Sequence, residues 1–143
     1  MTRRESREAV FTLLFEAEFN KEKTADEIMA SAKEVRDVKI NDYIVSTFRG
    51  VLENIDGIDE LISANADNWK ISRMSAVVRS LLRLCVYEML FGGIPPKAAI
   101  NEAVELAKKF DDASAPSFVN GILNKIAHKK GLIGNTCGSE VAE

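Results

Sequence analysis

The sequence PPKAAINEAVELAKKFDDASAPSFVNGILNKIA, residues 95–127, decides the fold of this chain. It contains two helical patterns joined by a short polar turn at 111–116, and the second pattern runs from about residue 116 to 129. Pro95 and Pro96 open the first pattern, where a missing N–H costs nothing. Apolar side chains recur every three or four residues along it, as on the buried face of an amphipathic helix: Ala99, Ile100, Ala103, Val104, Ala107 and Phe110.

The segment just before this stretch, 73–91, is apolar on nearly every side. A helix of that composition is expected at the centre of a fold, with several other helices packed on it. Gly92 and Gly93 end the helix, because glycine readily adopts the left-handed conformation that follows a helix C-terminus.

The first half of the chain also has helical periodicity. Thr24 and Glu27 have the spacing of a capping box, which starts a helix. Asn41 can cap the next helix, and Asp56 with Gly57 is expected to end it. The patterns predict helices over residues 4–19, 25–35 and 42–55, and a fourth from residue 58 onward.

Because no alternation of period two persists anywhere, the sequence predicts an all-α fold. We expect about seven helices in two small helical subdomains that form one compact domain over residues 1–130. The subdomains cover about 1–68 and 69–130, with a connector at 69–73. The glycine-rich residues 131–143 are expected to be a disordered tail.

Composition supports a single soluble domain. The chain has 143 residues, of which 46% are hydrophobic and 29% charged, and this length suits one core. No apolar run approaches the roughly 18 residues that a membrane span needs. The N-terminus lacks the apolar core of a secretory signal, so we expect a cytoplasmic protein without a membrane partner. Cys85 and Cys137 lie in such different contexts that a structural disulfide is not expected.

Charge is distributed unevenly along the chain, whose formal net charge is −3. Residues 1–15 carry three basic and two acidic side chains, and residues 69–143 carry ten basic and seven acidic ones. Residues 16–68 carry six basic and thirteen acidic side chains. The acidic excess is therefore confined to the first half, and the two ends of the domain can form a basic surface if they meet.

Three arginines near the N-terminus are candidates for RNA binding: Arg3, Arg4 and Arg7. A guanidinium group binds phosphate through its planar fork of donors and stacks on unpaired bases. The alternative is a solvated helix terminus with Arg–Glu pairs. Arginine at a helix N-terminus opposes the helix dipole, which suggests a further reason for its presence.

Two groups in the last helix also allow two interpretations. Phe118, beside Ser117, is either a core residue or a stacking platform for a base. Lys125, His128, Lys129 and Lys130 lie near the helix end, where cations complement the dipole and can also attract phosphate.

The sequence predicts no catalytic residues, metal ligands or cofactors. His128 is the single histidine, so neither a metal cluster nor a Cys–His–Asp arrangement is easily built. Gly92 and Gly93 have neither the spacing nor the Lys-Ser/Thr of a phosphate-binding loop. An enzyme is not expected.

Four motifs resemble the NusB family of transcription antitermination factors. Residues 82–88, LRLCVYE, are similar to its LRxxxYE signature, and residues 99–108 to its AINEAIELAK helix. Residues 118–123, FVNGIL, match its FVNGVLD block, with Asn124 in place of the usual Asp. Arg3, Arg4 and Arg7 lie where the family has its arginine-rich motif. The resemblance covers about residues 3–130.

The resemblance implies a fold of about seven helices in two three-helix subdomains. It implies binding to single-stranded boxA RNA together with NusE, a small-subunit ribosomal protein, within an RNA polymerase complex that resists termination, notably on ribosomal RNA operons. The implied RNA surface contains Arg3, Arg4, Arg7, Ser114, Ser117 and Phe118. The implied partner-binding positions are Phe15 and Val78.

The chain departs from the family pattern at several of these positions. Glu5 interrupts the arginine run, and Ser117 stands where the family commonly has lysine. Ser114 and Val78 replace residues that are acidic in some relatives. Losing the lysine is expected to weaken RNA affinity and to increase dependence on the partner protein.

Two other functions remain open at this stage. A NusB-like domain also forms the N-terminus of some ribosomal RNA cytosine methyltransferases, so the sequence could be a fragment of such an enzyme. A helical module that binds only proteins, including a homodimer, is the other alternative. Salt dependence distinguishes it, because phosphate contacts weaken with salt and an apolar interface responds little.

Overall fold

The computed structural model describes residues 1–67 and 69–132. Within these ranges every regular element is helical, which confirms the predicted all-α fold of seven helices. The elements are α1 (Arg3–Phe19), α2 (Ala25–Arg36), α3 (Asp42–Glu53), α4 (Ile55–Ala64), the 3-10 turn η1 (Ile71–Arg73), α5 (Ala76–Leu90), α6 (Pro96–Phe110) and α7 (Ala115–Lys129).

Side-chain caps start the helices of the first half. The predicted capping box of α2 is present: the Glu27 N–H donates to Thr24 Oγ1 over 3.1 Å, and the Thr24 N–H donates to Glu27 Oε1 over 2.8 Å. Asn41 caps α3 as expected, accepting from the Ile44 N–H over 2.9 Å. Thr2 and Glu5 form a second capping box at α1. Such caps bond backbone N–H groups that a first helical turn leaves free.

The break between α3 and α4 differs from the prediction. Asp56 and Gly57 do not end α3; they lie in the first turn of α4. The chain changes direction at Asn54, whose side-chain amide donates to the Gly50 carbonyl over 2.8 Å. The Asn54 backbone N–H also donates to the Gly50 and Val51 carbonyls, so asparagine caps the end of α3 in place of the expected glycine.

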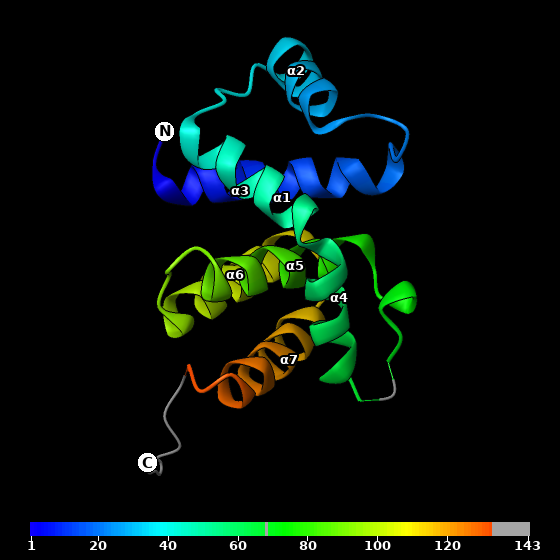
Figure 1. Cartoon of the computed structure of the whole chain (residues 1–143), viewed down its shortest axis with the longest axis vertical. Coiled ribbons are helices and arrows are strands. Elements are labelled where there is room, and N and C mark those ends of the chain that lie inside the picture. The colour runs from blue at the N-terminus through cyan, green and yellow to red at the C-terminus, as the bar shows by residue number, and fades with distance from the viewer. Residues whose placement is uncertain (68, 133–143) are drawn as a thin grey trace.

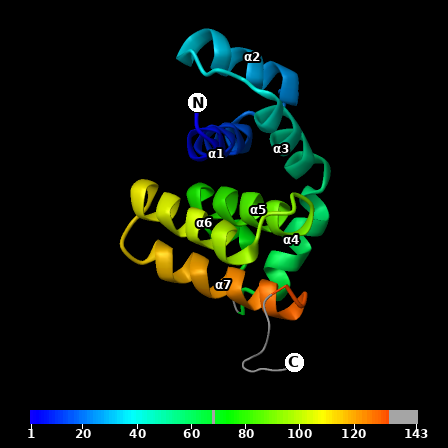
Figure 2. The ribbon, with the colours of Figure 1, turned by 90° about the vertical axis from the view of Figure 1, so that its left-hand side faces the viewer.

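Helix α5 lies at the centre of the molecule, as its apolar sequence predicted. It packs against α1, α3, α4, α6 and α7, and Figures 1 and 2 show it beside α6, with α1 to α3 on one side of these two helices and α7 on the other. Its largest fully buried side chains are Leu81, Leu82 and Val86. Burying a side chain of this size contributes about 1.5–3 kcal/mol, so these three residues contribute substantially to the stability of the core.

Helix α4 belongs in space with the second half of the chain. It contacts α5 and α7, and Figure 1 shows it beside them. The division into subdomains at residue 68 stays a prediction. Gly93 follows α5 with φ at +68°, a conformation that favours glycine. Of the predicted tail, residues 133–143 lie outside the described residues.

Candidate nucleic-acid interface

Arg7 is buried in a polar network that ties α1 to α5. Its side chain is 9% exposed, and its guanidinium donates to the two carboxylate oxygens of Glu88 over 2.7 and 3.1 Å. The Tyr43 hydroxyl of α3 donates to the same carboxylate over 2.8 Å. Burial and the neighbouring Glu88 charge raise the pKa of Tyr43, so its hydroxyl stays protonated and donates. In this conformation Arg7 does not reach the surface.

The other two arginines contact the edge of this network, since Glu102, the partner of Arg4, also lies 3.7 Å from the Arg7 guanidinium. Arg4 is 68% exposed and forms a two-pronged pair with Glu102 of α6, over 2.7 and 3.1 Å. The hydrogen bond and charge of Arg4 lower the pKa of Glu102, so this carboxylate holds the arginine near neutral pH. The Arg3 guanidinium lies over the Tyr43 ring, 4.1 Å from its centroid, and the residue is exposed. The three arginines therefore occupy three different environments.

The second predicted group lies at the start of α7. Ser114 and Ser117 are exposed, and the Ser114 hydroxyl donates to Asp112 Oδ1 over 2.6 Å. That hydrogen bond, with one from the Ser114 N–H, lowers the pKa of Asp112. Phe118 is half-buried. Its ring meets Trp69 edge to face, with centroids 5.6 Å apart, so one side of Phe118 packs inward and the other contacts an exposed aromatic.

A surface pocket of about 460 Å³ joins this group to the start of α5. We call it the platform pocket; its lining includes Trp69, Arg73, Val78, Ser114 and Phe118. It thus brings together three of the predicted residues. Asp111 also lines it and accepts a hydrogen bond from the Ser75 hydroxyl over 2.8 Å, which ties the α6–α7 turn to the cap of α5.

Two residues of the platform pocket were not predicted as site residues. Trp69 is 56% exposed and Arg73 is also exposed, on the segment that the sequence marked only as a connector. An exposed aromatic ring beside a guanidinium suits unpaired bases, through stacking and cation–π contacts. The sequence contained a signal for these two site residues, because the single tryptophan lies in a polar loop with basic residues on its C-terminal side.

The predicted partner-binding residues lie on different helices, Phe15 on α1 and Val78 on α5. Val78 is buried at 6% exposure, in the floor of the platform pocket. Phe15 is half-buried on α1, within a row of aromatic rings that continues from Phe110 through Phe11 and Phe15 to Phe19. Neighbouring centroids in this row are 5.1, 6.4 and 5.1 Å apart. Phe19 at the end of the row is exposed.

Helix α6 connects the arginines to the platform pocket. Arg4 pairs with Glu102, Lys109 pairs with Glu8 over 2.9 Å, and Asp111 lines the pocket. The nine residues from Glu102 to Asp111 correspond to about 13 Å along the helix axis.

The basic residues at the end of α7 have different surroundings. Lys125 pairs with Asp67 over 2.8 Å, and Lys130 lines a different groove. His128 and Lys129 lie in the last turn, where cations complement the helix dipole.

The described residues contain no cluster of three or more His, Cys, Asp and Glu side chains suited to a metal ion. Burial raises the pKa of the Cys85 thiol, so this cysteine stays protonated and buried. None of the helices in the described ranges has both the length and the apolar character needed to cross a bilayer.

Comparisons with known proteins identify the class and then the family. The described residues form a small all-helical protein with an aromatic pair, the exposed Trp69 and the half-buried Phe118, in a surface pocket beside Arg73. The NusB family model matches residues 4–128, and the chain belongs to the NusB family, whose members are non-enzymatic antitermination factors.

Individual members of the family that are similar to this chain support the assignment. The transcription antitermination protein NusB of Clostridium botulinum (strain Kyoto) is 41% identical, over 88% of this chain and 99% of that protein. NusB of Natranaerobius thermophilus is 42% identical, over 90% and 96%. Among solved structures, T. maritima NusB is 36% identical with a TM-score of 0.80, covering 90% of this chain and 92% of that one.

One solved relative was determined in complex with both a second protein and a nucleic acid. A structure of the antitermination factors NusB and NusE in complex with double-stranded RNA matches with 27% identity and a TM-score of 0.79, covering 89% of this chain and 96% of that one.

Proposed function

We propose that this chain binds single-stranded boxA-type RNA together with the ribosomal protein NusE. The complex would join RNA polymerase in the cytoplasm and promote transcription through terminators, notably in ribosomal RNA operons. The observation that carries the proposal is the platform pocket, where the exposed Trp69 ring meets Phe118 beside Arg73. The relative solved with NusE and double-stranded RNA supports NusE and RNA in general as partners.

In this proposal the platform pocket binds RNA bases, and the start of α1 binds RNA phosphates. Trp69 and Phe118 offer aromatic surface to splayed bases, and such stacking contributes about 1–3 kcal/mol per base. Ser114 and Ser117 are exposed at the same place and can hydrogen-bond base edges. Arg73 and Arg3 are exposed cations that can contact phosphate or stack on a base.

The chain alone is proposed to bind RNA weakly. Arg7 is paired with Glu88 and Arg4 with Glu102, so neither guanidinium is free for phosphate without breaking an existing pair. Position 117 is serine in place of the family's lysine. Few phosphate contacts mean low affinity and a shallow salt dependence. A second protein that contributes its own RNA contacts raises the effective concentration of both sites.

Arg7 is proposed to position the RNA surface instead of contacting RNA. Its bond to Glu88 fixes α1 against α5, and the same carboxylate holds Tyr43, over which Arg3 lies. Phe15 and Val78 are proposed to face the partner protein, Phe15 through the aromatic row of α1. Because Val78 is buried, its contribution would be the shape of the pocket floor.

Tryptophan fluorescence tests the platform directly, because Trp69 is the only tryptophan of the chain. Titration with a boxA-type RNA in the presence of NusE should quench this emission as a base stacks on the ring, after subtraction of the NusE signal. Phe118→Ala should weaken RNA binding roughly fivefold to thirtyfold, as expected for the loss of a stacking contact. Val35→Ala, at an exposed apolar side chain of α2 that belongs to neither the platform pocket nor the aromatic row of α1, should not change RNA binding. RNA binding without any change in Trp69 emission would contradict the proposed base contact.

A protein-only role is the second candidate, because carboxylates already pair with Arg4 and Arg7. It predicts a complex with NusE that forms equally well with and without RNA, and no RNA binding by the chain at low salt. RNA binding by the chain at low salt, or a NusE complex that forms better with RNA than without it, would therefore exclude the protein-only role.

A further inference from the structure

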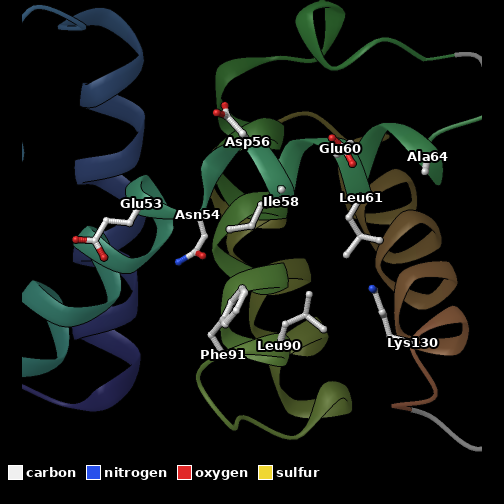
Figure 3. A pocket seen from close by; sticks show the side chains of 11 residues that line it. Glu53, Asn54, Asp56, Ile58, Glu60, Leu61, Ala64, Leu90, Phe91 and Lys130 are labelled. Carbon is white, nitrogen blue, oxygen red and sulfur yellow. The ribbon is translucent and has the colours of Figure 1, made fainter.

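A groove of about 550 Å³ lies between α4 and the C-terminal end of α5. It shares no lining residue with the platform pocket. Its apolar lining comes from two helices: Figure 3 shows Ile58 and Leu61 of α4 extending toward Phe91 and Leu90 at the end of α5. We call it the α4–α5 groove.

Phe91 is the most unusual residue of this groove. It follows the last residue of α5, and its side chain remains 57% exposed. One side of the ring packs against Tyr87, with centroids 5.5 Å apart, and the rest faces the groove and solvent. Aromatic rings exposed beside other apolar side chains are typical of protein contact sites, where they act as anchors.

The edge of the groove is acidic. Glu53, Asp56 and Glu60 are exposed and line it, and none of them belongs to an ion pair in the described ranges. The neighbouring Asp59, by contrast, is paired with Arg83 over 2.8 Å. Figure 3 shows the carboxylates of Glu53 and Asp56 turned outward from the apolar floor.

Local helix stability does not explain all of this charge. Asp56 lies in the first turn of α4, where an acid is favourable. Glu53 lies in the last turn of α3, where the negative end of the dipole makes an acid unfavourable. Lys130 is the one basic residue in the groove lining. The lining therefore has a net negative charge, which makes the electrostatic potential over the apolar floor negative.

We propose that the α4–α5 groove docks a basic amphipathic segment of a partner protein. The segment would bury an aliphatic or aromatic side chain against Phe91 and Leu90, and its lysines or arginines would face Glu53, Asp56 and Glu60. Charge complementarity selects this occupant, since complementary charge speeds encounter and suppresses wrong partners. Nucleic acid is repelled by the same carboxylates.

The rim charge also argues against this chain's own C-terminal residues as the occupant. Residues 133–143 contain Glu140 and Glu143 and no basic side chain. The groove is separate from the RNA surface, so a partner docked there leaves the platform pocket free. This interaction goes beyond the proposed function and stands independently of RNA binding.

The test uses the full chain labelled with ¹⁵N and two synthetic peptides. One is a helical peptide with leucine on one face and lysine on the other; its counterpart has glutamate in place of lysine. We expect the lysine peptide to shift the amide resonances of residues 53–61 and 90–92. The charge-neutralised variant Glu53→Gln, Asp56→Asn, Glu60→Gln and the variant Phe91→Ser should each weaken binding about tenfold, as the loss of a contact anchor does.

Matched variants separate docking from general effects. Phe19→Ser removes an exposed ring of similar accessibility on α1, and its affinity for the lysine peptide should equal that of the unaltered chain. Circular dichroism checks that each variant remains helical.

Several results would overturn the proposal. They are binding of the glutamate peptide with equal affinity, resonance shifts centred elsewhere, or insensitivity to both groove variants. Self-association in sedimentation equilibrium that Phe91→Ser abolishes would make a second copy the occupant. Broadening of the groove resonances by a nitroxide at Cys137 would make it the chain's own C-terminal residues.

Discussion

At the scale of single residues, burial decides what each arginine can do. Arg3, Arg4 and Arg7 look alike in the sequence, but Arg7 lies inside the protein and Arg4 at its surface. The buried pair with Glu88 also holds Tyr43. This network fixes the position of α1 against α5. The positions of the exposed Arg3 and Arg4 on α1 therefore depend on it.

Removing Glu88 should be strongly destabilising. Glu88→Ala removes the two short hydrogen bonds of the buried Arg7 and leaves it only the 3.7 Å pair with Glu102, which should cost up to about 3–5 kcal/mol of unfolding free energy. The double variant Arg7→Met, Glu88→Leu should recover most of this loss, because it buries no charge. Urea denaturation followed by circular dichroism measures both.

The matched control for Glu88→Ala is Glu16→Ala, which breaks the partly exposed pair with Arg36 and should cost no more than about 1 kcal/mol. Equal losses in Glu88→Ala and Glu16→Ala would show that the buried network does not hold the fold.

Glu18 should make the stability of the protein depend on acid pH. Burial tends to raise the pKa of this carboxyl, but the hydrogen bond from Arg79 and the charges of Arg83 and Arg79 outweigh it, so the pKa lies below the ordinary 4.5. The stabilisation is therefore fully present above pH 4.5 and is lost as the pH falls through the folded-state pKa.

Comparison of the unaltered chain with Glu18→Gln tests this dependence. The difference in unfolding free energy should be constant from pH 7 to about 5 and should shrink below pH 4.5. Glu34→Gln, at an exposed position of α2, serves as the control. A difference for Glu18→Gln that stays constant down to pH 3 would rule out the ion-pair explanation.

The environment of each arginine could not be predicted from the sequence. Glu88 is 81 residues from Arg7 and Glu102 is 98 residues from Arg4, and no local pattern links residues so far apart. The caps were predictable, because Thr24 and Asn41 bond groups only three residues away.

At the scale of elements, the hydrophobic periodicity predicted the helices correctly but did not predict the boundary between α3 and α4. The all-round apolar pattern of α5 correctly indicated a central helix. Glycine was expected to end α3, but Asn54 does so and Gly57 lies inside α4. Glycine weakens a helix without always ending it, so composition alone could not decide between these positions.

Gly50 should be essential for the packing of α3 on α5. A Cβ built at this position would lie 2.2 Å from the Tyr87 hydroxyl oxygen and 2.3 Å from its ring carbon Cζ. Gly50→Ala forces the ring to move and should destabilise by about 1–3 kcal/mol, as overpacking does. Thermal unfolding measures the effect.

Gly57→Ala is the matched control, because no atom lies within 4 Å of the added Cβ. Within α4 it should stabilise by about 0.5–1 kcal/mol through helix propensity. Combining Gly50→Ala with Tyr87→Ala should relieve the clash. If Gly50→Ala alone were as stable as the unaltered chain, the close approach of α3 to Tyr87 would be wrong.

At the scale of the whole molecule, the chain has two separate surfaces. The arginines, α6 and the platform pocket form the proposed RNA surface, and the α4–α5 groove forms an acidic surface that shares no residue with that pocket. The motifs of α5, α6 and α7 indicated the family from sequence. The position of Trp69 against Phe118 required the fold, since the two residues lie far apart in the sequence and the segment between α4 and α5 meets α7 only in the folded chain.

The central claim is that this chain binds RNA jointly with NusE through the platform pocket. The most direct test is the fluorescence anisotropy of a labelled boxA-type RNA with the chain, with NusE and with both, over a series of salt concentrations. Variants are Trp69→Ala with Phe118→Ala, and Arg3→Ala with Arg4→Ala, which keep the buried Arg7. We predict weak binding by the chain alone and tight binding with NusE that weakens with salt and decreases in both variants. No RNA binding by the mixture beyond that of NusE alone, by a folded protein, would contradict the account.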